Sequence, residues 1–285
     1  MKVNGLMSES NINSLPMVVI RPSRGWIPVN LRDLWIYREL IYFLTWREIK
    51  VRYKQTLLGA AWAVIQPFSM MVVFTLFFGK LAKVPSEGVP YPLFNYAALL
   101  PWILFAEAIT RSANSLVQDS NLVRKVYFPR LVMPLSGILS PLVDFVIAFT
   151  ILIGMMFYYG YLPTMQIIWL PLFIILALIT ALGVGLWLSA INVKYRDVRY
   201  VIPFVIQLWL FASPVVYSSN LLPEKFQIIY GLNPMAGVIE GFRWALLGTE
   251  PPGSLIAISV IIVVIILISG TFYFRRSEKT FADLI

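Results

Sequence analysis

Residues 165–191 read MQIIWLPLFIILALITALGVGLWLSAI and contain no charged side chain. A helix needs about 20 apolar residues to cross the hydrocarbon core of a bilayer, so this stretch predicts a membrane span. Five further stretches are long and apolar, namely 57–79, 94–116, 131–159, 200–218 and 255–274. The sequence therefore predicts an all-α integral membrane protein with six transmembrane helices.

Lysine and arginine concentrate in alternate gaps between these stretches. The N-terminal segment, the gap 119–130, the gap 192–199 and the C-terminal tail hold nine, three, three and three basic residues. The gaps 80–93, 160–164 and 219–254 hold two, none and two. Because basic loops stay on the cytoplasmic side, both termini are expected in the cytoplasm, with six spans between them.

Composition supports a membrane protein and excludes several kinds of chemistry. The chain is 59% hydrophobic, with a mean hydropathy of +0.78, which is far above that of a soluble domain. Its net charge of +9 follows from the basic cytoplasmic loops, so no nucleic-acid partner is expected. The absence of cysteine and histidine excludes disulfides, thiol catalysis and histidine bases. Residues 1–29 are expected to form a mobile cytoplasmic tail rather than a signal peptide.

Residues 30–54 predict a surface helix that is too charged to span a bilayer. Five side chains share one helical face, namely Trp35, Tyr42, Trp46, Ile49 and Tyr53, and basic residues occupy much of the remainder. Aromatic rings beside basic groups suit the headgroup layer, so this amphipathic helix should lie along the cytoplasmic membrane surface. A plain surface anchor is the alternative interpretation. Residues 55–285 then form the six-span transmembrane domain.

Three charged residues fall inside the predicted spans. Glu107 and Arg111 stand four positions apart on one helical face, so they should pair or line a watery interior. Asp144 has no obvious partner nearby in sequence, so a hydrogen bond to a neighbouring helix or a proton-relay role is expected. Pro134 and Pro141 also predict a kink or tilt in the third stretch.

The segment 219–254 is outward-facing by the charge pattern, but it contains no span. Residues 225–231 and 235–247 look helical, and Asn233-Pro234 marks a turn between them. Two short apolar helices at this position predict a re-entrant hairpin in the outer leaflet, between the fifth and sixth spans. A pair of helices lying flat on the outer surface is the alternative.

Several catalytic signatures are missing from the chain. It has no P-loop sequence, no nucleophile elbow, no zinc-protease motif and no dinucleotide fingerprint. It also lacks the carboxylate cluster that a metal-dependent membrane glycosyltransferase would need. The sequence therefore favours a passage over an enzyme, although an integral membrane glycan-processing enzyme remains the rival from another class.

Five segments together resemble the permease subunits of ABC-2-type polysaccharide exporters, which carry O-antigen, teichoic acid and capsular glycans. They are WREIKVRYKQTLLGAAWAVIQP (46–67), VRKVYFPRLVMP (123–134), NVKYRDVRY (192–200), QLWLFASPVVY (207–217) and YGLNPMAGVIEGFRWALLG (230–248). The resemblance covers about residues 30–285. The alternative within transport is an ABC-2 exporter of a drug or small lipid.

The resemblance implies a homodimer of six-span subunits in the bacterial cytoplasmic (inner) membrane, together with two copies of an ABC ATPase. The expected cargo is a glycan linked to undecaprenyl diphosphate, with O-antigen favoured, in contact with membrane lipids. ATP and magnesium would bind the partner ATPase, and this chain would hold no cofactor, metal or catalytic residue. The gap 119–130 resembles the coupling helix that contacts the ATPase, and its candidate residues are Asn121, Leu122, Arg124, Lys125, Tyr127, Phe128 and Arg130.

Two further residue sets complete the expected site. A diphosphate headgroup needs cations at the cytoplasmic interface, and Arg47, Lys50, Arg52 and Lys54 supply them; the alternative is that they serve topology and anionic-lipid attraction. Sugars present apolar C–H faces, so aromatic rings suit a glycan conduit, although such rings also pack bundles. The candidates are Trp62, Phe68, Phe74, Phe77, Trp209, Phe211 and Tyr217.

Overall fold

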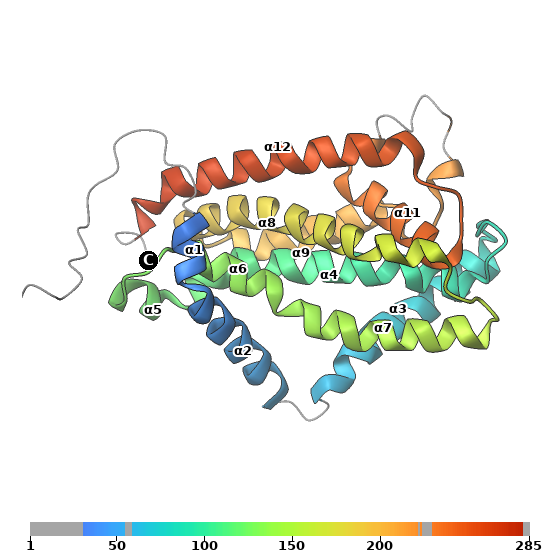
Figure 1. Cartoon of the computed structure of the whole chain (residues 1–285), viewed down its shortest axis with the longest axis horizontal. Helices are drawn as coiled ribbons and strands as arrows, with labels where there is room; N and C mark the ends of the chain where they lie inside the picture. Colours follow the sequence, from blue (N-terminus) through green and yellow to red (C-terminus); the bar gives the residue numbers. More distant parts are fainter. Residues whose placement is uncertain (1–30, 55–58, 222, 224–229, 282–285) are drawn as a thin grey trace, which may run out of the picture.

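The computed structural model describes residues 31–54, 59–221, 223 and 230–281, and these form a bundle of α-helices without a β-strand. Most helices run roughly along the long axis of the molecule (Figure 1). The predicted tail 1–29 lies outside the described residues, as does the first short helix expected at 225–231 for all but its last two positions.

Within the described residues, five segments are long and apolar enough to span a membrane, and a sixth apolar helix is shorter. The five are Gly59–Leu81, Tyr91–Gln118, Val132–Tyr158, Met165–Lys194 and Leu255–Glu278. They contain α3 (Trp62–Phe74) with the π-helix η3 (Thr75–Leu81), α4 (Tyr91–Gln118), α6 (Val132–Leu139) with α7 (Pro141–Tyr158), η4 (Met165–Trp169) with α8 (Leu170–Lys194), and α12 (Gly253–Glu278). The all-α membrane fold is thus confirmed for five of the predicted spans.

The predicted span 200–218 contains only the 14-residue helix α9 (Val198–Phe211). The helix ends there because Pro214 has no backbone N–H and its ring would clash with the carbonyl four residues earlier. The chain continues through turns to η5 (Ser219–Leu221). Beyond the undescribed residues, α11 (Pro234–Leu247) begins at an Asn233 cap and ends at Gly248, which adopts a left-handed φ of 68°.

Helix α4 forms the centre of the bundle. It packs against α3, α6, α7, α8, α9 and α11. Its side chains are therefore buried almost throughout, with Phe94, Tyr96, Leu99 and Phe105 fully inaccessible. An apolar helix buried on every side is expected only where other helices surround it.

The third predicted span is bent, as its prolines indicated. Helix α6 ends at Leu139 and α7 begins at Pro141, where the proline takes a position that needs no backbone donor. The two helices diverge visibly at this point (Figure 1). Asp144, one turn into α7, contacts Arg52 and Tyr53, which belong to the helix that precedes the first span.

Helices α8 and α12 approach closely through glycine. A Cβ atom placed on Gly270 would lie 2.2 Å from the carbonyl oxygen of Gly183, so neither position tolerates a side chain without separating the helices. Small residues permit this kind of backbone contact in membranes, where apolar burial alone gives little driving force.

The surface helix expected over 30–54 is divided into α1 (Leu31–Ile36) and α2 (Arg38–Lys54). Helix α2 leaves the bundle at a steep angle (Figure 1) and packs against α6. The expected face is split, because Ile49 is buried whereas Trp35 and Tyr42 are each 71% exposed. Leu44, which lies outside that face, supplies the other buried anchor.

The basic segments gather at one end of the bundle. This end, called the basic end, holds α1, the short helix α5 (Ser120–Lys125), the start of α9 and the close of α12 (Figure 1). The opposite end holds α11 and the loop after η3. The basic segments that alternate with apolar stretches along the sequence thus lie together at one end of the folded chain.

Candidate functional site

A polar cavity of about 160 Å³ lies where α2 and α3 meet α4 and α7. Apolar residues make up much of its wall, including Trp62, Pro67 and Leu104. Its charged lining residues are Arg52 from α2, Glu107 and Arg111 from α4, and Asp144 from α7. The structure therefore brings together a cation predicted for the headgroup and all three charges predicted inside spans, although the sequence placed them in separate elements.

The charges in the polar cavity are paired. Asp144 forms an ion pair with Arg52 and accepts a hydrogen bond from the Tyr53 hydroxyl. Arg111 Nε lies 3.4 Å from Glu107 Oε2, which confirms the expected pairing within the span. Two guanidinium groups thus face two carboxylates, so the cavity is close to neutral. An incoming phosphate would have to displace a carboxylate from a guanidinium, which it can do through a bidentate contact.

Burial shifts the pKa of two ionisable side chains of α2 that lie near the polar cavity, Arg52 and Glu48. It lowers the pKa of the Arg52 guanidinium, and the positive charge of Arg111 lowers it further. Burial also raises the pKa of the Glu48 carboxyl, while a hydrogen bond from Ser140 and the charge of Arg111 act in the opposite direction. The neighbourhood of Arg111 and Arg52 is therefore poor in solvent, and an added anion would interact with both strongly.

The other predicted headgroup cations divide between inward and outward positions. Arg47 is half-buried and forms an ion pair with Asp119 at the end of α4. Lys50 is exposed, with its ammonium 5.4 Å from the centre of the Trp46 ring, and Lys54 is also exposed. Arg47 and Arg52 consequently attach α2 to the spans, whereas Lys50 and Lys54 remain available to an approaching anion.

The predicted coupling segment has an exposed and a buried side. Asn121, Arg124, Lys125 and Tyr127 are exposed. Tyr127 is the most prominent apolar member, at 72% exposure, whereas Phe128 is only 6% exposed and belongs to the core.

Two more members of this segment are also turned toward the chain. Leu122 is half-buried, and Arg130 donates from Nη1 to the Glu278 carbonyl at 2.9 Å. A partner could therefore contact Tyr127, but the ring of Phe128 is committed to packing against the rest of the chain.

The candidate conduit aromatics fall into the same two classes. Trp62, Phe68, Phe77 and Phe211 are exposed, and Trp62 also lines the polar cavity. Trp209, in contrast, packs edge-to-face on Phe105 and donates to Asn233. Phe74 and Tyr217 are half-buried, and each contacts another ring. Only the exposed set can contact a second subunit or a passing glycan without rearrangement.

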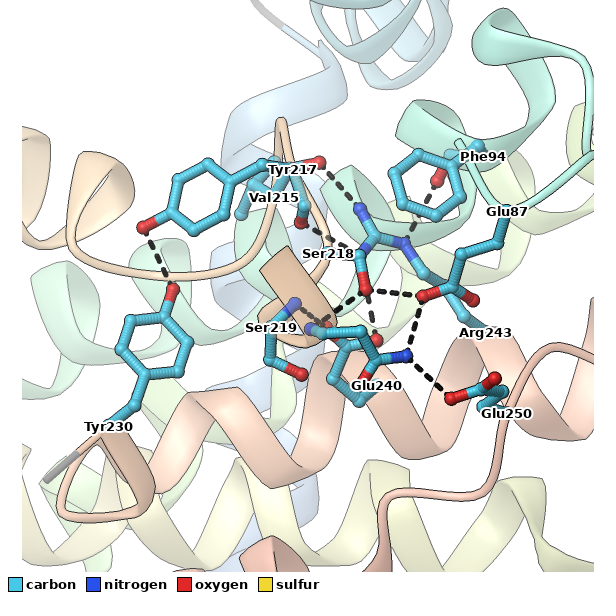
Figure 2. Close-up of polar contacts among 11 residues, drawn as sticks. Glu87, Phe94, Val215, Tyr217, Ser218, Ser219, Tyr230, Glu240, Arg243 and Glu250 are labelled. Carbon is cyan, nitrogen blue, oxygen red and sulfur yellow. Dashed lines mark hydrogen bonds and ion pairs between the residues drawn. The ribbon is translucent and has the colours of Figure 1, made fainter. Parts of the chain in front are cut away.

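A buried arginine organises the opposite end of the bundle (Figure 2). Arg243 of α11 is fully inaccessible and donates to the carbonyls of Phe94 (3.2 Å), Val215 (2.7 Å) and Tyr217 (3.2 Å). Its guanidinium carbon lies 3.6 Å from the centre of the Phe94 ring, and its Nη1 lies 3.7 Å from Glu240. Non-helical backbone needs such donors when water is absent, so Arg243 stabilises the turn that follows α9.

Neighbouring polar groups extend this arrangement. Glu240 accepts a hydrogen bond from the backbone N–H of Ser219 at 2.8 Å (Figure 2). The side-chain amide of Asn220 donates to Glu87 and to Glu250, at 3.0 Å each. The described part of the chain nevertheless brings no three carboxylates together as metal ligands.

Asn233 supports the same turn from the other side, because its amide donates to the carbonyl of Ala212 at 3.0 Å and to the Ser213 hydroxyl at 2.9 Å. The sequence analysis assigned no role to Arg243, and it predicted only that Asn233 lies in a turn before Pro234. The available signal was a lone Glu-Arg pair three residues apart within an apolar 14-residue helix.

Comparison with known proteins identifies relatives along most of the chain. Residues 39–247 match the family described as ABC-2 type transporter. The chain is 29% identical over 260 residues to the O-antigen export system permease protein RfbA of Myxococcus xanthus, covering 90% of this chain and 98% of that protein. It is 28% identical over 248 residues to the protein of the same name from Klebsiella pneumoniae (87% and 95%). It is 23% identical over 214 residues to the polysialic acid transport protein KpsM of Escherichia coli (70% and 78%).

Proposed function

The chain belongs to the ABC-2 type transporter family, and from this membership we propose that it is the permease subunit of an ATP-driven exporter of O-antigen polysaccharide. The observation that carries the proposal is its likeness, over nearly its whole length, to permeases of O-antigen export systems. The polysialic acid transport protein, at lower identity, also carries a polysaccharide, so the class of cargo agrees across these relatives.

We propose that the basic end faces the cytoplasm, with both termini on that side of the bacterial inner membrane. The gathering of the basic segments at one end supports this orientation. In this topology α9 and the turn after it form the fifth of six crossings, α12 forms the sixth, and α11 belongs to a re-entrant hairpin between them. The hydrogen bonds from Arg243 and Asn233 support the hairpin, because they satisfy irregular backbone that lipid could not.

Energy for transport must come from a partner, because the sequence contains no P-loop. We propose two copies of an ABC ATPase, which bind ATP and magnesium, beneath a dimer of this chain. The ATPase would contact α5 and Tyr127. Exposed aromatic side chains, namely Trp62 on α3, Phe77 on η3 and Phe204 on α9, are each more than 50% exposed and are available to the second copy of the chain.

The cargo enters, in this proposal, as a glycan on undecaprenyl diphosphate. Lys50 and Lys54 attract the anionic headgroup to the surface helix, each contributing about 1 kcal/mol. Arg52 and Arg111 lie behind them in the polar cavity, where phosphate oxygens can replace the carboxylate partners. The ion pairs then hold the cavity closed in the absence of cargo.

The test is deletion of the gene followed by fractionation of the cell. The deletion strain should lose O-antigen from its surface and accumulate lipid-linked glycan on the cytoplasmic side, and a plasmid copy should restore export. An unchanged surface glycan with increased sensitivity to a toxic compound would instead support a drug exporter. A surface glycan of altered structure but normal amount would support a glycan-processing enzyme.

A further inference from the structure

The seam between α3 and α7 contains a second hollow beyond the polar cavity. This groove, of about 590 Å³, is lined on α3 by Phe68, Met71 and Val72, and on α7 by Ile151, Gly154 and Met155. Thr75, Leu76 and Lys80 of η3 close one side; Pro92, Thr150, Tyr158 and Tyr159 complete the lining. The groove is called the α3–α7 groove below.

The polar cavity and the α3–α7 groove follow one another along the same two helices. On α3 the cavity reaches Pro67 and the groove begins at Phe68. On α7 the cavity reaches Ala148 and the groove begins at Thr150. The polar cavity, with Arg52 and Arg111, therefore lies on the side of the basic end. The apolar α3–α7 groove begins within one helical turn of it and extends toward the opposite end.

Lys80 is the charged residue of the α3–α7 groove. It is exposed, and among the residues that the structure describes it forms no ion pair. The remaining lining is apolar or carries only hydroxyl groups. An apolar trough with one cation at its outer end is complementary to an amphiphile that has a hydrocarbon chain and an anionic headgroup.

The π-helix η3 explains how the polar groups reach this position. Its hydrogen bonds close over five residues rather than four, and Thr75 and Lys80, which are five residues apart, both line the groove. In an α-helix these two residues would diverge around the axis, because 3.6 residues complete a turn. The hydroxyl oxygen of Thr75 is buried and has no hydrogen-bond partner in the described structure. Such π-helical turns occur frequently at functional sites.

We propose that the α3–α7 groove binds the lipid carrier of the exported glycan in the outer half of the membrane, with its isoprenoid chain against α7 and its phosphate at Lys80. This inference rests on the proposed function. The groove is continuous with the polar cavity, so cations that can bind phosphate lie at both ends of the path, Arg52 and Arg111 at one end and Lys80 at the other. This continuity favours the carrier over a bulk phospholipid. The carrier would move along this seam while the glycan passes elsewhere.

The test is native mass spectrometry of the purified transporter, with its ATPase, after incubation with undecaprenyl phosphate. Lys80→Gln should reduce the retained lipid roughly fivefold, as expected for the loss of one cation near a phosphate. Gly154→Trp should also reduce it, because a Cβ at Gly154 meets open space and a large ring there would fill the groove. The matched controls are Lys83→Gln in the adjoining loop and Val146→Trp at an exposed position of α7, and both should retain the lipid as the parent does.

Equal retention by the parent, Lys80→Gln and Gly154→Trp would overturn the site. Displacement of undecaprenyl phosphate by an equal amount of phosphatidylglycerol would overturn the choice of the carrier as occupant. Lys80 is exposed, so its substitution remains informative even where Gly154→Trp fails to fold. The binding measurement is independent of glycan export, so a deletion strain that still exports O-antigen would refute the proposed function without changing the binding result.

Discussion

Arg47 of α2 forms an ion pair with Asp119, the residue that joins α4 to α5. The pair connects two elements that are 72 residues apart in sequence. Because α5 is the proposed contact of the ATPase, a displacement of α5 would move Asp119 directly. Arg47 would then transmit that displacement to α2, which forms one wall of the polar cavity through Arg52.

The first prediction follows from this connection. Asp119→Asn should reduce export and ATPase stimulation severalfold while changing the free energy of unfolding by no more than about 1 kcal/mol, because partly exposed ion pairs contribute little to stability. Combining Arg47→Asp with Asp119→Arg should restore part of the activity. Measurements of surface glycan and of thermal unfolding in detergent distinguish these effects. Arg38→Ala, which removes the exposed pair with Glu39, is the control and should behave like the parent; equal loss in both variants would contradict a specific connection.

A second prediction concerns Arg243. Arg243→Ala should lower the free energy of unfolding by about 3–5 kcal/mol, since it leaves the buried Glu240 carboxylate without its cationic partner and three carbonyls without the donor that Arg243 supplies. Arg243→Lys should recover only part of the loss, because an ammonium lacks the planar fork that reaches several carbonyls. Thermal unfolding of the purified protein gives the measurement. Arg276→Ala at an exposed position should leave stability unchanged, and a mild effect of Arg243→Ala would show that the turn after α9 is held by other contacts.

The spans could be predicted from the sequence because hydropathy is a local property. An apolar stretch of about 20 residues is sufficient by itself to favour a transmembrane position. The end of α9 was harder to predict. Pro214 marks it, but a span through 218 would still satisfy hydropathy. The turn is stable because donors on α11 reach its carbonyls. No local pattern contains that information.

The candidate site shows the same division between local and distant causes. Glu107 and Arg111 pair across one helical turn, so their spacing alone predicted the contact. Asp144 accepts a hydrogen bond from Tyr53 of α2, which lies 91 residues earlier in the sequence, and it forms an ion pair with Arg52 of the same helix. These contacts occur in the first turn of α7, just after Pro141. The local sequence pattern could not indicate that these charges meet in one polar cavity.

A third prediction uses the pH dependence of stability. Burial raises the pKa of Glu48 in the folded protein above its ordinary value near 4.5, so the ionised carboxylate is less favourable folded than unfolded. The stabilising effect of the protonated form is complete below that ordinary value and is lost as pH rises through the folded pKa. Glu48→Gln should therefore match the parent in mildly acidic buffer and become the more stable protein toward neutral pH.

Melting temperatures between pH 5 and pH 8 test this expectation. The exposed Glu39 provides the control substitution, Glu39→Gln. A difference between Glu48→Gln and the parent that stays constant across the range would show that the Glu48 carboxyl does not titrate differently on folding.

The last prediction separates the two aromatic neighbours of the coupling segment. Tyr127→Ala removes a ring that is 72% exposed, so the free energy of unfolding should change by no more than about 0.5 kcal/mol. It should nevertheless weaken binding of the ATPase and reduce glycan export, because an exposed aromatic side chain is a frequent anchor in protein interfaces. Phe128→Ala should instead cost about 3–5 kcal/mol of stability, since it empties space in the core formed with Leu131 and Phe274.

Co-purification of the tagged chain with its ATPase, together with thermal unfolding, gives both readings on each variant. Phe128→Leu retains most of the buried volume and should restore stability without altering binding. Normal co-purification and export by Tyr127→Ala would place the ATPase contact away from this residue. The chain would then engage its partner through the exposed cations Arg124 and Lys125, for which a steep dependence of binding on salt concentration is the expected signature.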